Sequence, residues 1–219
     1  MQSATQNSSN HRSGFTLIEL MVVVGLMGLL LAFAIPAFQG IGRSAGINAA
    51  VQELRTTVSL ARQWAITQRQ SAFVVFPDEL LTYTEESAPK ALRAYSVFSG
   101  DEYIKGWTFL PQNVIFDPVF EPQAAVNLWS TGSDTGTLTD VPFPLNDSGQ
   151  QELRSVEFRT RGNTRFTANK TIFLTEGFVP VTGASVGDPV FLPGRMVIGL
   201  NIWRDTGLYR IREYDSSGL

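Results

Sequence analysis

The chain has 219 residues, 43% of them hydrophobic and 17% charged, and 17 basic against 20 acidic residues give a net charge of −3. This balance suits one globular domain with an anchor and argues against a domain whose main role is to wrap nucleic acid. The absence of cysteine excludes disulfides, thiolate nucleophiles and cysteine-ligated zinc. We therefore expect a protein that is not an enzyme and that needs no metal or cofactor.

A long apolar stretch near the amino terminus carries one misplaced charge. Residues 1–13 are polar, whereas the span from Phe15 to Ile35 holds Glu19 as its single charged residue. At 1.5 Å of rise per residue, such a helix spans about 31 Å, close to the thickness of a bilayer's hydrocarbon core. A carboxylate inside a membrane helix costs on the order of a few kcal/mol, so Glu19 needs a compensating partner. The stretch is predicted to be a transmembrane helix with a functional carboxylate.

The residues around that charge form a specific motif. The run Gly14–Glu19, GFTLIE, and the apolar helix that follows resemble the class III signal of type IV pilins and type II secretion pseudopilins. The resemblance implies that a prepilin peptidase cuts between Gly14 and Phe15, removes the leader 1–14 and methylates Phe15. It also implies that Glu19 accepts the amino-terminal ammonium of a neighbouring subunit in a filament.

The same resemblance implies the partners and the location of the protein. The partners would be other pilins or pseudopilins in a hetero-oligomeric filament, the prepilin peptidase, an inner-membrane assembly platform and the lipid bilayer. The chain would cross the inner membrane once and place its carboxy-terminal head in the periplasm, an orientation that charge bias alone does not indicate. Cleavage after Gly14 would also remove His11, the one histidine, and so exclude histidine-based catalysis in the mature chain.

Two alternatives concern the same residues. An ordinary signal peptide would be cut after the A-x-A sequence at 32–34, but Glu19 and the helical pattern beyond that cut argue against it. The mature chain would then begin at Ile35. The Glu19 carboxylate could also reach the membrane interface, or be satisfied by the amides of its own first helical turn.

The helix is expected to weaken just beyond the apolar span. Pro36 removes one backbone hydrogen bond, and Gly40 and Gly42 each cost up to about 1 kcal/mol relative to alanine. We expect residues 15–39 to form a transmembrane and polymerisation helix. Residues 40–70 are expected to form a hinge followed by an amphipathic helix.

The second half of this helix is amphipathic. From Ile47 to Ala65, apolar residues recur at alternating steps of four and three, which predicts a face that packs against a sheet. Arg55, Arg62 and Arg69 lie seven residues apart and therefore share a stripe of the helix. A solvated face explains this stripe, and a contact with acidic surfaces of neighbouring subunits is the alternative.

The rest of the chain, 71–219, follows the two-residue period of β-strands. Strands are expected at Ser71–Phe76, Leu80–Thr84, Leu92–Phe98, Ile104–Leu110, Asn113–Phe116, Leu153–Phe158, Thr171–Thr175, Met196–Trp203 and Leu208–Glu213. The sequence Arg204-Asp205-Thr206-Gly207 predicts a tight hairpin between the last two, with glycine where a positive φ is usual. The expected fold class is α+β, a long amino-terminal α-helix packed on an antiparallel β-sheet or β-sandwich head.

Residues 117–150 interrupt the strand pattern. This segment contains several prolines and a polar run at 131–136, so we expect a long, variable surface loop of the kind in which recognition often resides. Asp134, Asp140 and Asp147 lie within it. Their spacing matches no EF-hand loop, and turn formation explains them without a metal.

The order of one helix, many strands, a variable loop and a terminal hairpin resembles the GspH/FimT group of minor pseudopilins and minor pilins. The runs 156–162 and 202–210 carry this part of the resemblance. It implies a minor pseudopilin of type II secretion, at or near the tip of a periplasmic pseudopilus. A minor type IV pilin that acts in pilus assembly or DNA uptake is the first alternative. A soluble periplasmic domain with an ordinary signal peptide is the second.

Six arginines form two groups in the last third of the chain. They are Arg159, Arg161 and Arg165, and then Arg204, Arg210 and Arg212. On a common face they would make a phosphate-binding patch for DNA or a charged partner. Strand-edge arginines that keep a sheet soluble are the more common explanation, which we favour over DNA binding.

Overall fold

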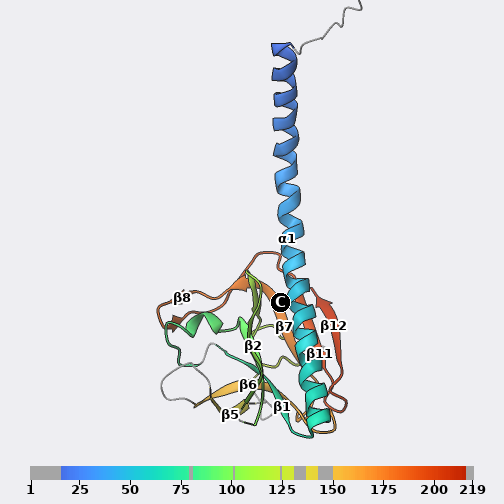
Figure 1. The fold of residues 1–219 in the computed structure, drawn as a ribbon, viewed down its shortest axis with the longest axis vertical. Helices are drawn as coiled ribbons and strands as arrows, with labels where there is room; N and C mark the ends of the chain where they lie inside the picture. Colours follow the sequence, from blue (N-terminus) through green and yellow to red (C-terminus); the bar gives the residue numbers. More distant parts are fainter. Residues whose placement is uncertain are drawn as a thin grey trace, which may run out of the picture. The chain divides into compact units, whose positions relative to one another are not determined.

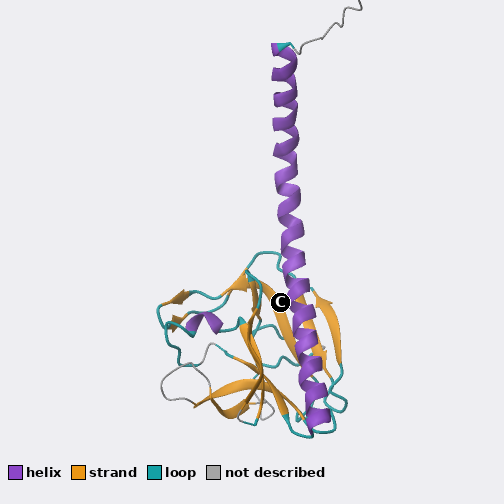
Figure 2. Ribbon diagram, viewed as in Figure 1, coloured by secondary structure: helices purple, strands orange, loops and turns teal. Residues whose placement is uncertain are grey.

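The computed structural model describes residues 16–78, 81–100, 102–123, 125–130, 137–142 and 150–215, except for the side chains of 32–44, 137–142 and 150–152. The chain divides into two compact units, Met1–Gly42 and Arg43–Leu219. Figure 2 shows the secondary structure of the described residues, with a long helix, a short 3₁₀ turn and a set of β-strands.

The first part of the helix α1 (Leu17–Gln68) is apolar on all sides apart from Glu19. Every side chain from Leu17 to Leu31 is exposed, with Leu17 at 77% and Leu30 at 68% of its surface. A helix that is apolar all round is normally buried in a protein core or a membrane. Among the described residues, no helix combines the length and the hydropathy that a membrane span requires.

The second part of α1 has the core face that the sequence predicts. The predicted positions are all at most 2% exposed: Ile47, Val51, Leu54, Val58, Ala61 and Ala65. Burying each of the larger aliphatic side chains contributes about 1.5–3 kcal/mol. The helix ends at Gln68, and Arg69 follows in the left-handed conformation with φ 54°, where a glycine is usual after a helix.

Five antiparallel strands form the first sheet, in the order β3-β2-β1-β6-β5. Their bounds are β1 Ala72–Phe76, β2 Ala94–Ser99, β3 Glu102–Phe109, β5 Thr137–Pro142 and β6 Gln150–Phe158. In the centre, Val74 of β1 lies opposite Val97 of β2 and Val156 of β6. Because side chains alternate along a strand, this register places the three valines on one face, which joins the core formed with α1.

The second sheet has the order β10-β7-β11-β12, and β4 also pairs with β7. Its bounds are β4 Val114–Phe116, β7 Lys170–Phe178, β10 Val190–Phe191, β11 Val197–Ile202 and β12 Tyr209–Tyr214. Ile172 and Leu200 lie opposite each other on the face that joins the core with α1. Figure 1 shows β11 and β12 beside the second part of α1. A short third sheet pairs β8 Val181–Thr182 with β9 Ser185–Val186.

Both large sheets also bury side chains on their outer faces. On the first sheet, Val75, Phe98 and Leu153 pack with residues of the segment 81–92. On the second sheet, Phe173 and Tyr214 pack with Phe120, with ring centroids 5.0–6.0 Å apart. The antiparallel α+β architecture that the sequence predicts is therefore confirmed for the described residues.

One predicted strand is wrong. Leu80 lies outside the described residues, and 81–84 form no strand but lead to a 3₁₀ turn, η1 (Ala88–Lys90). Tyr83 is buried there, and its hydroxyl donates a hydrogen bond to the backbone oxygen of Asp78. The apolar residues of this segment cover the outer face of the first sheet instead of joining its edge, which is why their alternation resembles that of a strand.

The prediction of a surface loop at 117–150 is correct only in part: the described residues of 117–130 form no helix or strand and some are exposed, but several apolar side chains there are buried. Phe120, Leu128 and Trp129 are at most 5% exposed, and Leu128 donates its N–H to the backbone oxygen of Thr171 at 2.9 Å. Further along, β5 adds an edge strand to the first sheet. Asp134, Asp147 and the side chain of Asp140 lie outside the described residues.

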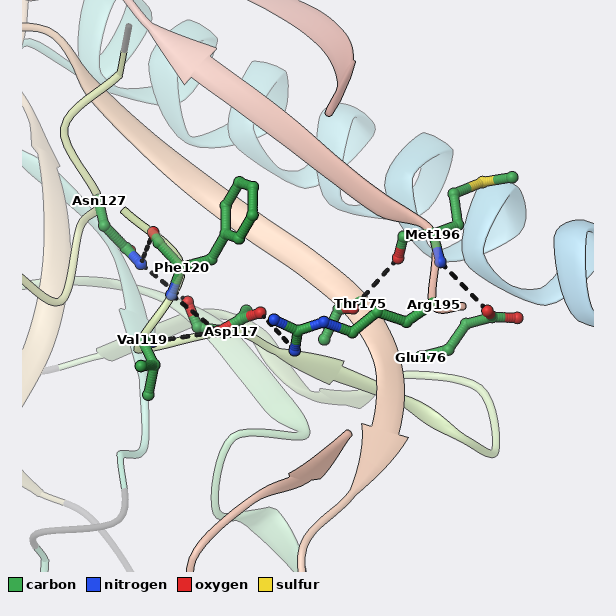
Figure 3. A network of polar contacts seen from close by, with 8 residues as sticks. All are labelled: Asp117, Val119, Phe120, Asn127, Thr175, Glu176, Arg195 and Met196. Carbon is green, nitrogen blue, oxygen red and sulfur yellow. Dashed lines mark hydrogen bonds and ion pairs between the residues drawn. The ribbon is translucent and has the colours of Figure 1, made fainter. Parts of the chain in front are cut away.

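A buried polar network fixes the start of this segment. Oδ1 of Asp117 accepts hydrogen bonds from the N–H groups of Val119 and Phe120, both at 3.0 Å. Oδ2 of the same carboxylate lies 2.9 Å from Nη1 of Arg195. Figure 3 shows the two side chains pointing toward each other. Burial raises the pKa of Asp117, and this effect outweighs the lowering by Arg195 and by the two amide hydrogen bonds. The guanidinium of Arg195 also stacks 3.8 Å from the ring centroid of Phe191.

The predicted tight hairpin is a wider turn. Ile202 and Tyr209 form the last strand pair, and the N–H of Trp203 donates to the backbone oxygen of Leu208 at 2.9 Å. Gly207 has φ 63°, as the sequence predicts for a glycine in this turn. A Cβ on Gly207 would lie 2.1 Å from the backbone oxygen of Gly162, so the turn also needs glycine for a close approach between two loops.

Candidate functional site

The first described residues form a capping box at the start of α1. The N–H of Glu19 donates to Oγ1 of Thr16 at 3.3 Å, and the N–H of Thr16 donates to Oε2 of Glu19 at 3.4 Å. The hydroxyl of Thr16 also lies 3.4 Å from Oε2. Two backbone donors of the first turn are thereby satisfied reciprocally. The alternative in which Glu19 serves its own first turn is thus present in the structure, and the T-x-x-E spacing is the sequence signal for it.

The remaining residues of the predicted amino-terminal sites are less fully described. Gly14 and Phe15 lie outside the described residues. Pro36, Gly40 and Gly42 lie within α1, but only the helical backbone is described at these positions. The boundary between the two compact units falls directly after Gly42. Cleavage, methylation and the hinge therefore stay predictions.

Two of the three arginines on the helix stripe bind the carboxy-terminal part of their own chain. Nε of Arg62 donates to the backbone oxygens of Thr206 at 2.9 Å and Gly162 at 3.2 Å. Nε of Arg55 donates to the hydroxyl of Tyr209 at 2.9 Å. Arg55 is exposed, as expected for a solvated face, and Arg62 is partly buried, but both arginines also clamp the turn and β12 onto α1. These contacts are 100 to 154 residues apart in sequence, so no local pattern could have predicted them.

The clamp also changes the acidity of Tyr209. Burial is the largest single effect on its pKa and raises it. The hydrogen bonds with Ser59 and Arg55 and the positive charge of Arg55 together outweigh burial, so the pKa of Tyr209 is lowered.

The six carboxy-terminal arginines have different surroundings in the structure, although the backbone of Arg204 lies against Thr164, next to Arg165. Nη1 of Arg165 lies 3.4 Å from Glu157, and Nε of Arg204 lies 3.0 Å from Asp205. Nη1 of Arg204 also donates to the backbone oxygen of Thr167 at 2.5 Å. Arg159 and Arg161 belong to the exposed loop after β6. Arg210 and Arg212 alternate on β12 and line one small cavity together.

Metal binding has no support in the described part of the chain. No group of three or more histidine, cysteine, aspartate or glutamate side chains there is arranged to hold a metal ion. The buried carboxylates Asp78 and Asp117 have guanidinium partners in Arg154 and Arg195.

The amino-terminal motif is the part of the chain that known proteins share. A family model described as the prokaryotic N-terminal methylation motif matches residues 9–35, which include Gly14, Phe15 and Glu19. In its amino-terminal segment, the chain is similar to type IV pilins and pseudopilins. The recognition made from the run GFTLIE is thus confirmed at the level of the superfamily.

Three pilin-type relatives share short segments with the chain. A "Fimbrial protein" of Moraxella nonliquefaciens is 42% identical over 57 residues, which are 25% of this chain and 37% of the relative. The "Prepilin peptidase-dependent protein D" of Escherichia coli (strain K12) is 48% identical over 50 residues, 22% of this chain and 34% of the relative. The "Fimbrial protein EcpB" of Eikenella corrodens is 46% identical over 46 residues, 21% of this chain and 29% of the relative.

The pilin match therefore leaves most of the chain unassigned. The chain spans only 29–37% of the length of these relatives, and the family model ends at Ile35. No solved structure matches the chain significantly. The matches do not distinguish the GspH/FimT group from other pilins, so that subgroup is a matter for proposal.

Proposed function

We propose that this pilin-like chain is a minor pseudopilin of a type II secretion system, assembled at or near the tip of a pseudopilus. The observation that carries the proposal is the methylation motif at 9–35 combined with Glu19 in the first turn of an otherwise apolar helix. A prepilin peptidase would cut between Gly14 and Phe15. The apolar helix would hold the chain in the inner membrane, with the head in the periplasm, until the filament takes it up.

The geometry at Glu19 supports a pairing between subunits. Its hydrogen bonds with Thr16 use Oε2, and among the described residues Oε1 has no donor, so it can accept a further one. Cleavage before Phe15 would create an ammonium group on each neighbouring subunit. In a low-dielectric filament core, an ion pair of this kind is strong only at the right distance, so it would set the axial register of the subunits.

The irregular surface of the head supports the proposed tip position. The segment that starts at Asp117 is held by buried hydrogen bonds and the turn at 203–208 by the arginine clamp, so both present an irregular surface of fixed conformation. Such a surface suits contacts with particular neighbours better than the repeated contacts of a major subunit.

Amino-terminal mass spectrometry of the chain purified from membranes tests the processing. We expect a first residue of N-methylated Phe15. A chain that begins at Ile35 would instead indicate an ordinary signal peptide and would refute the proposal.

A minor type IV pilin is the second candidate, and the fimbrial names of two relatives favour it. Deleting the gene in its native host distinguishes the two. If the chain is a secretion subunit, its deletion is expected to abolish the export of extracellular enzymes and to leave surface pili intact. Loss of pili or of DNA uptake, with secretion unchanged, would assign the chain to a type IV pilus.

A further inference from the structure

A small polar cavity lies on the outer face of the second sheet. It has a volume of about 190 Å³ and is lined by Asn169, Asn201, Trp203, Arg210 and Arg212. Arg210 lies opposite Asn201 in the pairing of β12 with β11. Ile211 lies between the two arginines along β12, and Tyr209 precedes them. Both pack against the core with α1, so the arginines point to the opposite face of the sheet.

The two arginines give the cavity a positive charge that no acidic side chain of the described residues pairs with. Among the described residues, neither Arg210 nor Arg212 forms an ion pair, whereas Arg165 and Arg204 each have a carboxylate partner. Residues two apart on a strand are separated by about 6.7 Å, so the two guanidinium groups can reach one anion. Carboxylate and phosphate groups are the anions that arginine binds with paired, charge-assisted hydrogen bonds.

The two amides of the cavity are held in fixed orientations. Nδ2 of Asn201 donates to Oγ1 of the buried Thr171 at 3.0 Å, which leaves Oδ1 of Asn201 as an acceptor. Oδ1 of Asn169 accepts the N–H of Arg204 at 3.1 Å, which leaves Nδ2 of Asn169 as a donor. A preset donor and acceptor beside an anion site fit a ligand that carries hydroxyl groups, because a hydroxyl both donates and accepts.

Trp203 supplies an aromatic wall, and the volume limits the size of the ligand. The side chain of Trp203 is 38% exposed, so part of its ring is open to a ligand with an apolar face. The volume is below the roughly 300–1,000 Å³ of sites that enclose drug-sized ligands, so the cavity accommodates about one ring. Single-stranded nucleic acid is normally bound by several aromatic side chains along a groove, and this cavity has one.

We propose that this cavity binds a hexuronic acid unit, such as one residue of an acidic polysaccharide. The carboxylate lies between Arg210 and Arg212, the hydroxyls pair with Asn169 and Asn201, and the apolar face of the sugar lies on Trp203. This role is independent of filament assembly, which uses the amino-terminal helix.

Ligand titrations of the full chain in detergent micelles, followed by saturation-transfer NMR, test the proposal. Glucuronate is expected to bind saturably in the millimolar range, and neutral glucose about tenfold more weakly because it lacks the carboxylate. Arg210→Gln and Arg212→Gln are each expected to weaken glucuronate binding about tenfold, and Trp203→Ala to weaken it severalfold. Arg165→Gln is the matched control, because Arg165 is an exposed arginine outside the cavity, and it is expected to change nothing.

Three results would overturn the proposal. The first is equal affinity for glucose and glucuronate. The second is a loss of binding in Arg165→Gln as large as that in Arg210→Gln. The third is an absence of glucuronate binding. This result would overturn the proposal even if the same arginines bound an oligodeoxythymidylate, which serves as a probe for single-stranded DNA. Near-UV circular dichroism of each variant checks that the head remains folded.

Discussion

Asp117 shows how a single buried carboxylate can organise a segment that has no regular structure. It is fully buried, and its two oxygens serve different parts of the chain. One oxygen accepts the N–H groups of Val119 and Phe120, and the other faces Arg195. Without the first oxygen, two amide donors in a buried turn would lose their acceptor. The turn therefore depends on an oxygen at this position more than on a charge.

Substitution of Asp117 separates these two contributions. Asp117→Ala is expected to lower the free energy of unfolding by about 3 kcal/mol, because it leaves the amides of Val119 and Phe120 unsatisfied. Asp117→Asn keeps an acceptor oxygen and is expected to cost less than about 1 kcal/mol. Urea denaturation of the full chain in micelles, followed by near-UV circular dichroism, measures both. Equal losses in the two variants would show that the charge matters more than the oxygen.

The pH dependence of the same comparison follows from the raised pKa of Asp117. An acid whose pKa is raised on folding binds more protons in the folded state, so its contribution to stability grows as the pH falls from above the folded pKa toward the unfolded value of 3.8. The stability of the wild type relative to Asp117→Asn is therefore expected to increase on acidification. An ion pair that lowered the pKa would give the opposite trend.

At the scale of elements, the clamp formed by Arg62 joins three parts of the chain. Its guanidinium bridges α1 to the loop at Gly162 and to the turn at Thr206. The two loops touch where Gly207 approaches Gly162. The end of α1 thus positions the turn before β12, which carries the cavity arginines on its outer face.

Arg62→Ala is expected to destabilise the β-rich unit by about 2 kcal/mol. Two backbone oxygens lose a charged donor, and the partial exposure of Arg62 keeps the cost moderate because water replaces part of the contact. Thermal unfolding followed by tryptophan fluorescence measures the loss. Arg161→Ala, at an exposed arginine of the adjacent loop, is the control and is expected to change stability by less than about 0.5 kcal/mol. Equal stability of the two variants would mean that the clamp contributes nothing.

The elements that the sequence predicts well are those with a strong local period. On α1 from Ile47 to Ala65, apolar residues recur every three to four residues, and on the central strands they recur every two. Each of these periods indicates which side of the element is buried. The burial in two segments without strands was missed. Residues 81–84 and Phe120 pack against the outer faces of the sheets, whereas Leu128 and Trp129 join the main core with α1, and neither kind of burial requires a strand. Strands β8, β9 and β10 have two residues each, too few to establish a period.

At the scale of the whole molecule, predictability differs between the two units. The motif Gly14–Glu19 lies in consecutive residues, and sequence alone was enough to recognise the family that it resembles. The clamp and the cavity join residues from distant parts of the chain, so their chemistry emerges only with the topology of the second sheet. The arginines themselves were singled out from the sequence, but not which of them have carboxylate partners.

The proposed assembly of the whole chain rests on Glu19, and three substitutions distinguish its two roles. Glu19→Gln keeps the capping box, since glutamine serves there as well as glutamate, but removes the charge. Thr16→Ala does the reverse, because it keeps the carboxylate and weakens the cap by about 1 kcal/mol. Glu19→Ala removes both. If the carboxylate pairs with a neighbouring subunit's ammonium, both Glu19 variants are expected to enter the membrane normally and to be depleted from sheared filaments, whereas Thr16→Ala is incorporated.

Immunoblots of the membrane and filament fractions measure how much of each variant is incorporated. Normal incorporation of Glu19→Gln together with failure of Thr16→Ala would assign the residue to helix capping and refute the pairing.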